Sequence, residues 1–180
     1  PAKLNSGNMF AGLLANTLNG GETVDGETVE QALPQLQEIF SRLGYMETSS
    51  ADLFSQFLKM GVGAKPMIAG YESQLLEFAV EEPEDFAQLK DDLVMLYPAP
   101  TVWSTHIYIA LTENGERAID GLLDEDIQRL AWEKHGFRTN VYLAATSVDD
   151  FGVDGLAPEI TQVTQIPNYQ TMKRIIDSLD

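Results

Sequence analysis

The chain has 180 residues, of which 44% are hydrophobic, so it is long and apolar enough to bury a core. Its 28 acidic and 11 basic residues give a formal net charge of -17, which argues against nucleic-acid binding and against docking on anionic lipid. The absence of cysteine excludes disulfides, thiolate zinc sites and cysteine nucleophiles.

The first part of the chain is predicted to be helical. The polar stretch Asn5-Ser6-Gly7-Asn8 precedes apolar residues at helical spacing and predicts a helix that ends before Gly20. Residues 27–43 carry a second apolar stripe, in which Pro34 either kinks one helix or begins another. Ser49, with Asp52 three residues later, predicts the start of a third helix with a buried stripe.

The rest of the chain alternates between apolar runs and helical patterns. The apolar runs at 67–70, 92–98, 101–113 and 139–146 predict strands. Helices are expected near 73–81, 83–91, 114–121, 124–135 and 168–179, the fourth capped by Asp124 and ended by Gly136. This alternation predicts an α/β fold with a sheet covered by helices on both faces.

The sequence contains no pattern that singles out a catalytic or metal site. The two histidines, His106 and His135, lack the HExxH spacing of zinc proteases. The acidic residues Asp149, Asp150 and Asp154 do not have the spacing of a calcium loop. We therefore expect a protein that is not an enzyme and needs no metal or cofactor; the remaining enzymatic alternative is a hydrolase that uses His106 with a nearby carboxylate.

Two predicted helix starts could bind a ligand. Residues 5–8 and the stretch "GYESQ" at 70–74 each place hydroxyl or amide side chains and free backbone N–H groups at a helix N-terminus. Either one alone is most often only a cap. If both faced one cleft, they would bind a small polar or anionic solute.

The order of these stretches resembles a known family. The segments "NSGNMFAGLLANTLNGG", "GYMETSSADLF", "GYESQLLEF", "LYPAPTVWSTHIYIAL", "DIQRLAWEKHGFR" and "IPNYQTMKRIIDSL" resemble the second lobe and C-terminal return of a type II periplasmic or extracellular solute-binding protein of ABC transporters. The resemblance implies one α/β domain over 1–180, a three-layer αβα lobe with a mixed sheet, excised from a two-lobed protein. Residues 124–180 would be the returning segment.

The same resemblance implies a function and a site. The chain would bind solute without catalysis and pass it to an ABC-type membrane permease, outside the cytoplasm, in the periplasm or at the cell surface with a lipid anchor on a preceding segment. The solute-binding residues would be Asn5, Ser6, Gly7 and Asn8, with Tyr71 and Glu72 beside them. Glu72 would repel an anion unless it is paired or protonated.

The chain departs from the family because the lobe that precedes "NSGN" in complete members is missing. The C-terminal segment would then need another partner, such as a second copy of the chain in a homo-oligomer. The alternative function is an extracellular protein-interaction or sensory module that reuses the solute-binding fold.

Overall fold

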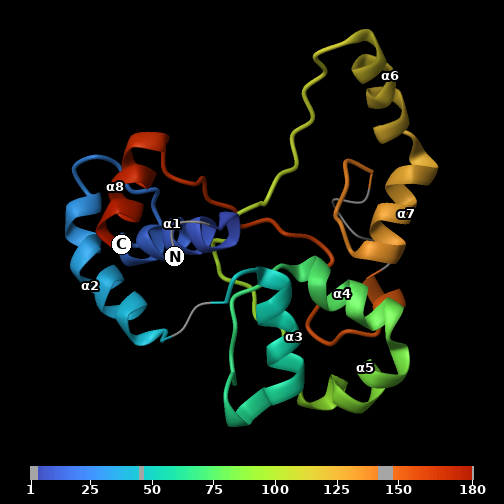
Figure 1. Cartoon of the computed structure of the whole chain (residues 1–180), viewed down its shortest axis with the longest axis horizontal. Coiled ribbons are helices and arrows are strands. Elements are labelled where there is room, and N and C mark those ends of the chain that lie inside the picture. Colours follow the sequence, from blue (N-terminus) through green and yellow to red (C-terminus); the bar gives the residue numbers. More distant parts are fainter. Residues whose placement is uncertain (1–3, 45–46, 142–147, 180) are drawn as a thin grey trace. The chain divides into compact units, whose positions relative to one another are not determined.

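The computed structural model describes residues 4–44, 47–141 and 148–179, and every regular element within them is helical (Figure 1). The α-helices are α1 (Asn5–Leu18), α2 (Val29–Arg42), α3 (Ser50–Met60), α4 (Glu72–Glu81), α5 (Pro83–Leu89), α6 (Glu113–Leu122), α7 (Glu125–His135) and α8 (Tyr169–Leu179). Short 3-10 turns, η1 (Gly61–Gly63), η2 (Lys90–Asp92) and η3 (Val148–Phe151), lie between them.

The predicted α/β fold is wrong, and with it the three-layer periplasmic-binding-protein type II lobe and its mixed sheet. In the described part of the chain the only β contact is an isolated parallel bridge between Thr101 and Val163. The Thr101 N–H donates to the Gln162 carbonyl at 3.0 Å, and the Thr164 N–H donates to the Thr101 carbonyl at 2.8 Å.

The physical reason is that a strand depends on a neighbouring segment. The runs at 67–70, 92–98 and 101–113 have the apolar composition of strands, but ladder hydrogen bonds must come from elsewhere in the chain. Within the described ranges only Thr101, at the start of the third run, has such a neighbour, at Val163, so the runs form no regular strand. Of the fourth predicted strand, residues 142–146 lie outside the described residues.

The chain divides into two compact units. The first unit comprises Pro1–Gly70, Pro98–Ser104 and Gln162–Asp180, and the second comprises Tyr71–Tyr97 and Thr105–Thr161. The segment expected to return at 124–180 is therefore divided: its end, with α8, belongs to the first unit.

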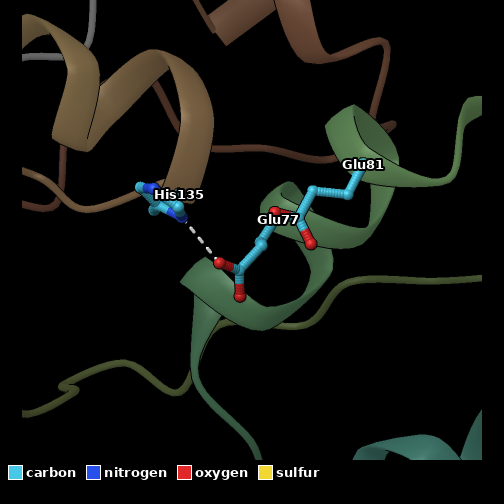
Figure 2. A group of neighbouring side chains, drawn as sticks. All are labelled: Glu77, Glu81 and His135. Atoms are coloured by element: carbon cyan, nitrogen blue, oxygen red, sulfur yellow. Dashed lines mark hydrogen bonds and ion pairs between the residues drawn. The ribbon is translucent and has the colours of Figure 1, made fainter.

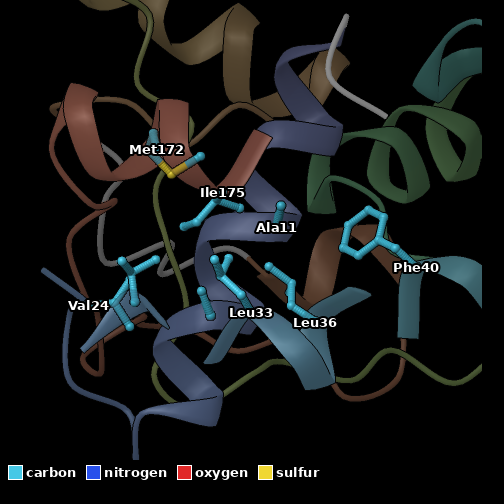
Figure 3. Packing of buried hydrophobic residues seen from close by; sticks show 9 residues of the cluster. Ala11, Val24, Leu33, Leu36, Phe40, Met172 and Ile175 are labelled. Atoms are coloured by element: carbon cyan, nitrogen blue, oxygen red, sulfur yellow. The ribbon is translucent and has the colours of Figure 1, made fainter. Parts of the chain in front are cut away.

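The core of the first unit lies where α1, α2 and α8 meet (Figure 3). Its buried side chains are Ala11, Ala15, Val24, Val29, Leu33, Leu36, Phe40, Met172 and Ile175. A Cβ added at Gly12 would lie 3.0 Å from the Met172 sulfur, so this glycine lets α1 and α8 approach closely. The apolar face of α8 is thus covered inside the unit by α1 and α2.

A buried amide, Asn16 on α1, connects three segments of the first unit. Its side-chain nitrogen donates to the Gln165 carbonyl at 2.9 Å, and its side-chain oxygen accepts from the Val24 N–H at 3.0 Å. Asn16 is fully buried, so these bonds offset the cost of removing the amide from water.

The core of the second unit is smaller and centres on Trp132. Leu76, Phe151 and Leu156 are buried with it, and the Phe151 ring meets the indole edge-on with 4.9 Å between ring centroids. Met95 and Tyr97 pack against this cluster from the non-helical segment that follows η2.

The end of α7 fits closely against α4. Gly136 has a φ of 64° in the left-handed region, and its N–H donates to the Trp132 carbonyl at 2.9 Å. A Cβ at this position would lie only 2.5 Å from the Cβ of Leu76. Gly136 therefore both ends α7 and lets its last turn touch α4.

The local helix signals are confirmed. The Ser49 hydroxyl accepts from the Asp52 N–H at 3.0 Å at the start of α3, and Asp124 accepts from the Ile127 N–H at 3.2 Å at the start of α7. Pro34 lies inside the single helix α2. The buried stripe expected on α3 is wrong, because no residue of this helix is buried.

Candidate functional site

The predicted solute-binding residues fall into two groups that belong to different units. Asn5, Ser6, Gly7 and Asn8 form the first turn of α1 in the first unit, whereas Tyr71 and Glu72 begin α4 in the second. The residues of the first group therefore lie together at the start of α1, and those of the second group lie together at the start of α4.

The first group has little capping of its own. The N-cap residue of α1 is Leu4, whose side chain accepts no hydrogen bond. The Asn5 amide reaches the Met9 sulfur at 3.5 Å, a weak contact. The side chains of Ser6 and Asn8 form no hydrogen bond with any other residue that the structure describes. Among the described residues, the Ser6 and Asn8 side chains therefore retain donors and acceptors that are not used.

The second group is engaged internally. Tyr71 is the N-cap of α4, and its N–H donates to the side-chain oxygen of Gln74 at 3.1 Å. Glu72 receives two bonds from the Arg138 guanidinium, from Nε at 2.7 Å and from Nη2 at 3.1 Å. It also accepts a bond from the Tyr97 hydroxyl at 2.6 Å. Glu72 is thus paired, as an anion-binding role would require, but its oxygens are occupied.

Arg138 is the central residue of this network, and no pattern in the sequence points to it. Its side chain is 3% exposed, and its guanidinium lies 5.4 Å from the centre of the Trp132 ring. It also donates to the carbonyls of Ala157 and Pro158. The guanidinium of Arg138 therefore joins the start of α4 to the segment after η3.

The network also changes the acidity of Tyr97. Burial of the phenol raises its pKa well above the ordinary value, and the hydrogen bond to the Glu72 carboxylate raises it further. Tyr97 therefore stays protonated and donates to Glu72. The geometry supports a structural role for this group, not proton transfer.

A second cluster of polar side chains joins α4 to the end of α7 (Figure 2). Glu77 and Glu81 lie one turn apart on α4, and His135 is the last residue of α7. The Nδ1 atom of His135 lies 2.7 Å from a Glu77 carboxylate oxygen. One potential ligand atom from each of the three residues lies within 4.8 Å of the others. No metal site was expected from the sequence, in which the only local signal for one is the four-residue spacing of the two glutamates.

The other histidine shows no catalytic arrangement. The His106 ring meets the Phe137 ring edge-on, with 5.6 Å between the ring centroids. Among the described residues no carboxylate forms an ion pair with His106. The contact with Phe137 is a packing contact and supplies no general base.

The most prominent surface feature is an uncharged segment between η2 and α6. From Leu93 to Thr112 the sequence has no Asp, Glu, Lys or Arg. The side chains of Ile107, Ile109 and Leu111 are 80%, 73% and 88% exposed. Apolar residues so fully exposed and so close in sequence are unusual for a free-standing protein.

Comparisons with protein-family models, curated proteins and solved structures found no match to the chain. Among the described residues no helix combines the length and apolar character needed to cross a membrane.

Proposed function

We propose that the chain is a protein-interaction module whose residues 93–97 receive an extended, apolar segment of a partner protein. The observation that carries this proposal is the alternation of burial along the segment. Met95 and Tyr97 pack into the core of the second unit, whereas Val94 and Leu96, between them, are 78% and 75% exposed. This is the period-two pattern of a strand that has one face on a core and a second apolar face uncovered.

Covering the outer face would be favourable. Complete burial of a valine or leucine side chain stabilises by about 1.5–3 kcal/mol. A partner strand laid along residues 93–97 would cover Val94 and Leu96 and supply main-chain hydrogen bonds at the same time. This mode of recognition adds one strand from outside and requires no sheet within the chain.

The charge of the chain indicates the chemistry of the partner. Asp91 and Asp92 lie directly before the apolar segment, and the whole chain carries a net charge of -17. Basic residues beside an apolar partner segment would be attracted, whereas a second copy of this chain would be repelled. The proposed partner is therefore an extended apolar segment flanked by lysine or arginine.

Synthetic peptides test this assignment. Three fluorescent peptides share a core of alternating valine and threonine: one has lysine flanks, one has glutamate flanks, and one has lysine flanks and a central proline. Fluorescence anisotropy should show binding of the first and at least tenfold weaker binding of the other two. Binding of no peptide, or equal binding of all three, would overturn the proposal.

A pair of variants locates the binding surface. The double change Val94→Thr and Leu96→Thr keeps strand propensity and removes the apolar contact, so it should weaken binding of the lysine-flanked peptide at least tenfold. Tyr169→Thr is the matched control, because Tyr169 is 80% exposed and lies in the first unit. Sedimentation equilibrium completes the test: a stable dimer of the chain alone would refute the cationic partner.

Solute capture is a second candidate function, supported by the unused Ser6 and Asn8 side chains at the start of α1. In this case Asn5, Ser6, Gly7 and Asn8 bind one side of a small polar or anionic solute outside the cytoplasm, for delivery to an ABC-type permease. A thermal-shift screen with sulfate, glucose and glutamate tests it. Stabilisation that disappears in the Ser6→Ala and Asn8→Ala double variant, but persists in Thr17→Ala, would support capture; no stabilisation by any of them would count against it.

A further inference from the structure

We propose that Glu77, Glu81 and His135 form a binding site for a divalent transition-metal ion of the zinc class. The three side chains come from two helices and converge on one point at the surface of the second unit (Figure 2). Their ligand atoms lie within 4.8 Å of one another, which is close enough for all three to reach one ion after small rotamer adjustments.

The backbone holds the three residues in place. Glu77 follows the fully buried Leu76, and His135 precedes Gly136, which touches Leu76. The close approach of Leu76 and Gly136 therefore sets His135 beside Glu77. Glu81 lies one helical turn after Glu77, so its carboxylate falls on the same face of α4.

The ligand types favour zinc over calcium or magnesium. One imidazole and two carboxylates suit Zn²⁺, Ni²⁺ or Cu²⁺, whereas Ca²⁺ and Mg²⁺ prefer oxygen ligands alone. Three protein ligands leave a fourth position for water, as in zinc sites that are open to solvent. A bound cation would also reduce the electrostatic repulsion between the Glu77 and Glu81 carboxylates. His135 forms its ion pair with Glu77 and leaves the Glu81 charge uncompensated.

The contact between His135 and Glu77 is compatible with this role. The 2.7 Å between His135 Nδ1 and the Glu77 oxygen is a hydrogen-bond distance. A metal ion would bind both atoms in place of the hydrogen-bonded proton, which is released to solvent. An exposed ion pair of this kind contributes little to stability, so exchanging it for metal ligation leaves the fold intact.

Calorimetric titration of the chelator-treated full chain with Zn²⁺ tests the site. We expect one saturable site that Ca²⁺ does not compete for. Glu81→Gln should weaken Zn²⁺ binding at least tenfold, and His135→Gln should do the same. Glu84→Gln is the matched control, because Glu84 is also an exposed glutamate in this region but lies on α5, outside the cluster.

A second measurement guards against loss of folding in the variants. Zn²⁺ should raise the thermal midpoint of the wild-type chain and of Glu84→Gln, and should leave that of Glu81→Gln unchanged. Titration with Co²⁺ should produce the visible absorption of a four-coordinate site. Unchanged Zn²⁺ affinity in Glu81→Gln, equal displacement by Ca²⁺, or several weak sites in place of one would each overturn the proposal.

Discussion

Gly136→Ala should destabilise the second unit strongly, because the structure opposes a side chain at this position in two ways. The φ of 64° lies in the left-handed region, where an L-residue costs about 1–2 kcal/mol. The added Cβ would also lie 2.5 Å from the Leu76 Cβ and 3.0 Å from its Cδ1. Overpacking of this kind typically costs about 1–3 kcal/mol, so the expected total is about 2–5 kcal/mol.

A matched glycine separates the two contributions. Gly152 has a φ of 60° in the same unit, but a Cβ there would meet nothing within 4 Å. Gly152→Ala should therefore cost only the backbone term of about 1–2 kcal/mol. The difference between the two variants measures the contact between α4 and α7.

Trp132 provides the assay. It is 1% exposed in the core of the second unit, and Trp103→Phe removes the only other tryptophan. Urea unfolding followed by Trp132 fluorescence then reports on this unit in both glycine variants. If Gly136→Ala is no more destabilising than Gly152→Ala, the close approach of Leu76 to residue 136 is not a feature of the folded protein.

Three further changes probe the buried polar groups and the start of α2. Arg138→Met should cost about 3–5 kcal/mol, because it leaves the Glu72 carboxylate, which is only 16% exposed, without its counter-ion; the double change with Glu72→Met should be milder in urea unfolding. Asn16→Leu should cost about 2–4 kcal/mol, because it removes partners from the Val24 N–H and the Gln165 carbonyl; an unchanged unfolding midpoint would contradict this. The pKa of Asp25 is lowered, chiefly by the hydrogen bond from the Thr28 N–H. The stabilisation that Asp25 gives to the start of α2 is therefore fully present above its ordinary pKa of 3.8 and is lost as the pH falls through the lower folded pKa. Amide NMR of the first turn of α2 from pH 5 to 2 should show this loss. In Asp25→Asn the pH dependence should be absent.

The helix ends could be predicted from the sequence because their causes are local. Ser49, Asp124 and Gly136 each act within a few residues of the helix that they begin or end. A capping hydroxyl or a glycine in the left-handed region acts in the same way whatever the rest of the chain does. The bounds of α3 and α7 therefore followed from short patterns.

The sheet was predicted wrongly because its causes are not local. Leu93 to Tyr97 has the composition of a strand, yet a strand exists only where another segment hydrogen-bonds to it. In the described part of the chain only Thr101 and Val163 meet in this way. An apolar run shows that a segment will be buried if it has a partner, and gives no information on whether the partner is present.

The environment of Glu72 could not have been read from the sequence either. Its counter-ion, Arg138, lies 66 residues away, and no spacing rule connects the two. The same holds for His135 and Glu77, which are 58 residues apart. Their proximity depends on the packing of α4 against α7, and no local pattern in the sequence indicates that packing.

The exposed segment from residue 105 to 111 has a consequence for how the protein behaves in concentrated solution. At neutral pH the molecules repel one another because each carries a net charge of -17. This repulsion keeps the protein in solution despite the exposed Ile107 and Leu111. At the isoelectric point, near pH 4.2, this repulsion vanishes, and concentrated salt screens it at any pH. Purification near pH 4.2, or in concentrated salt, would then bring these apolar side chains of different molecules into contact, and precipitation would begin at this segment.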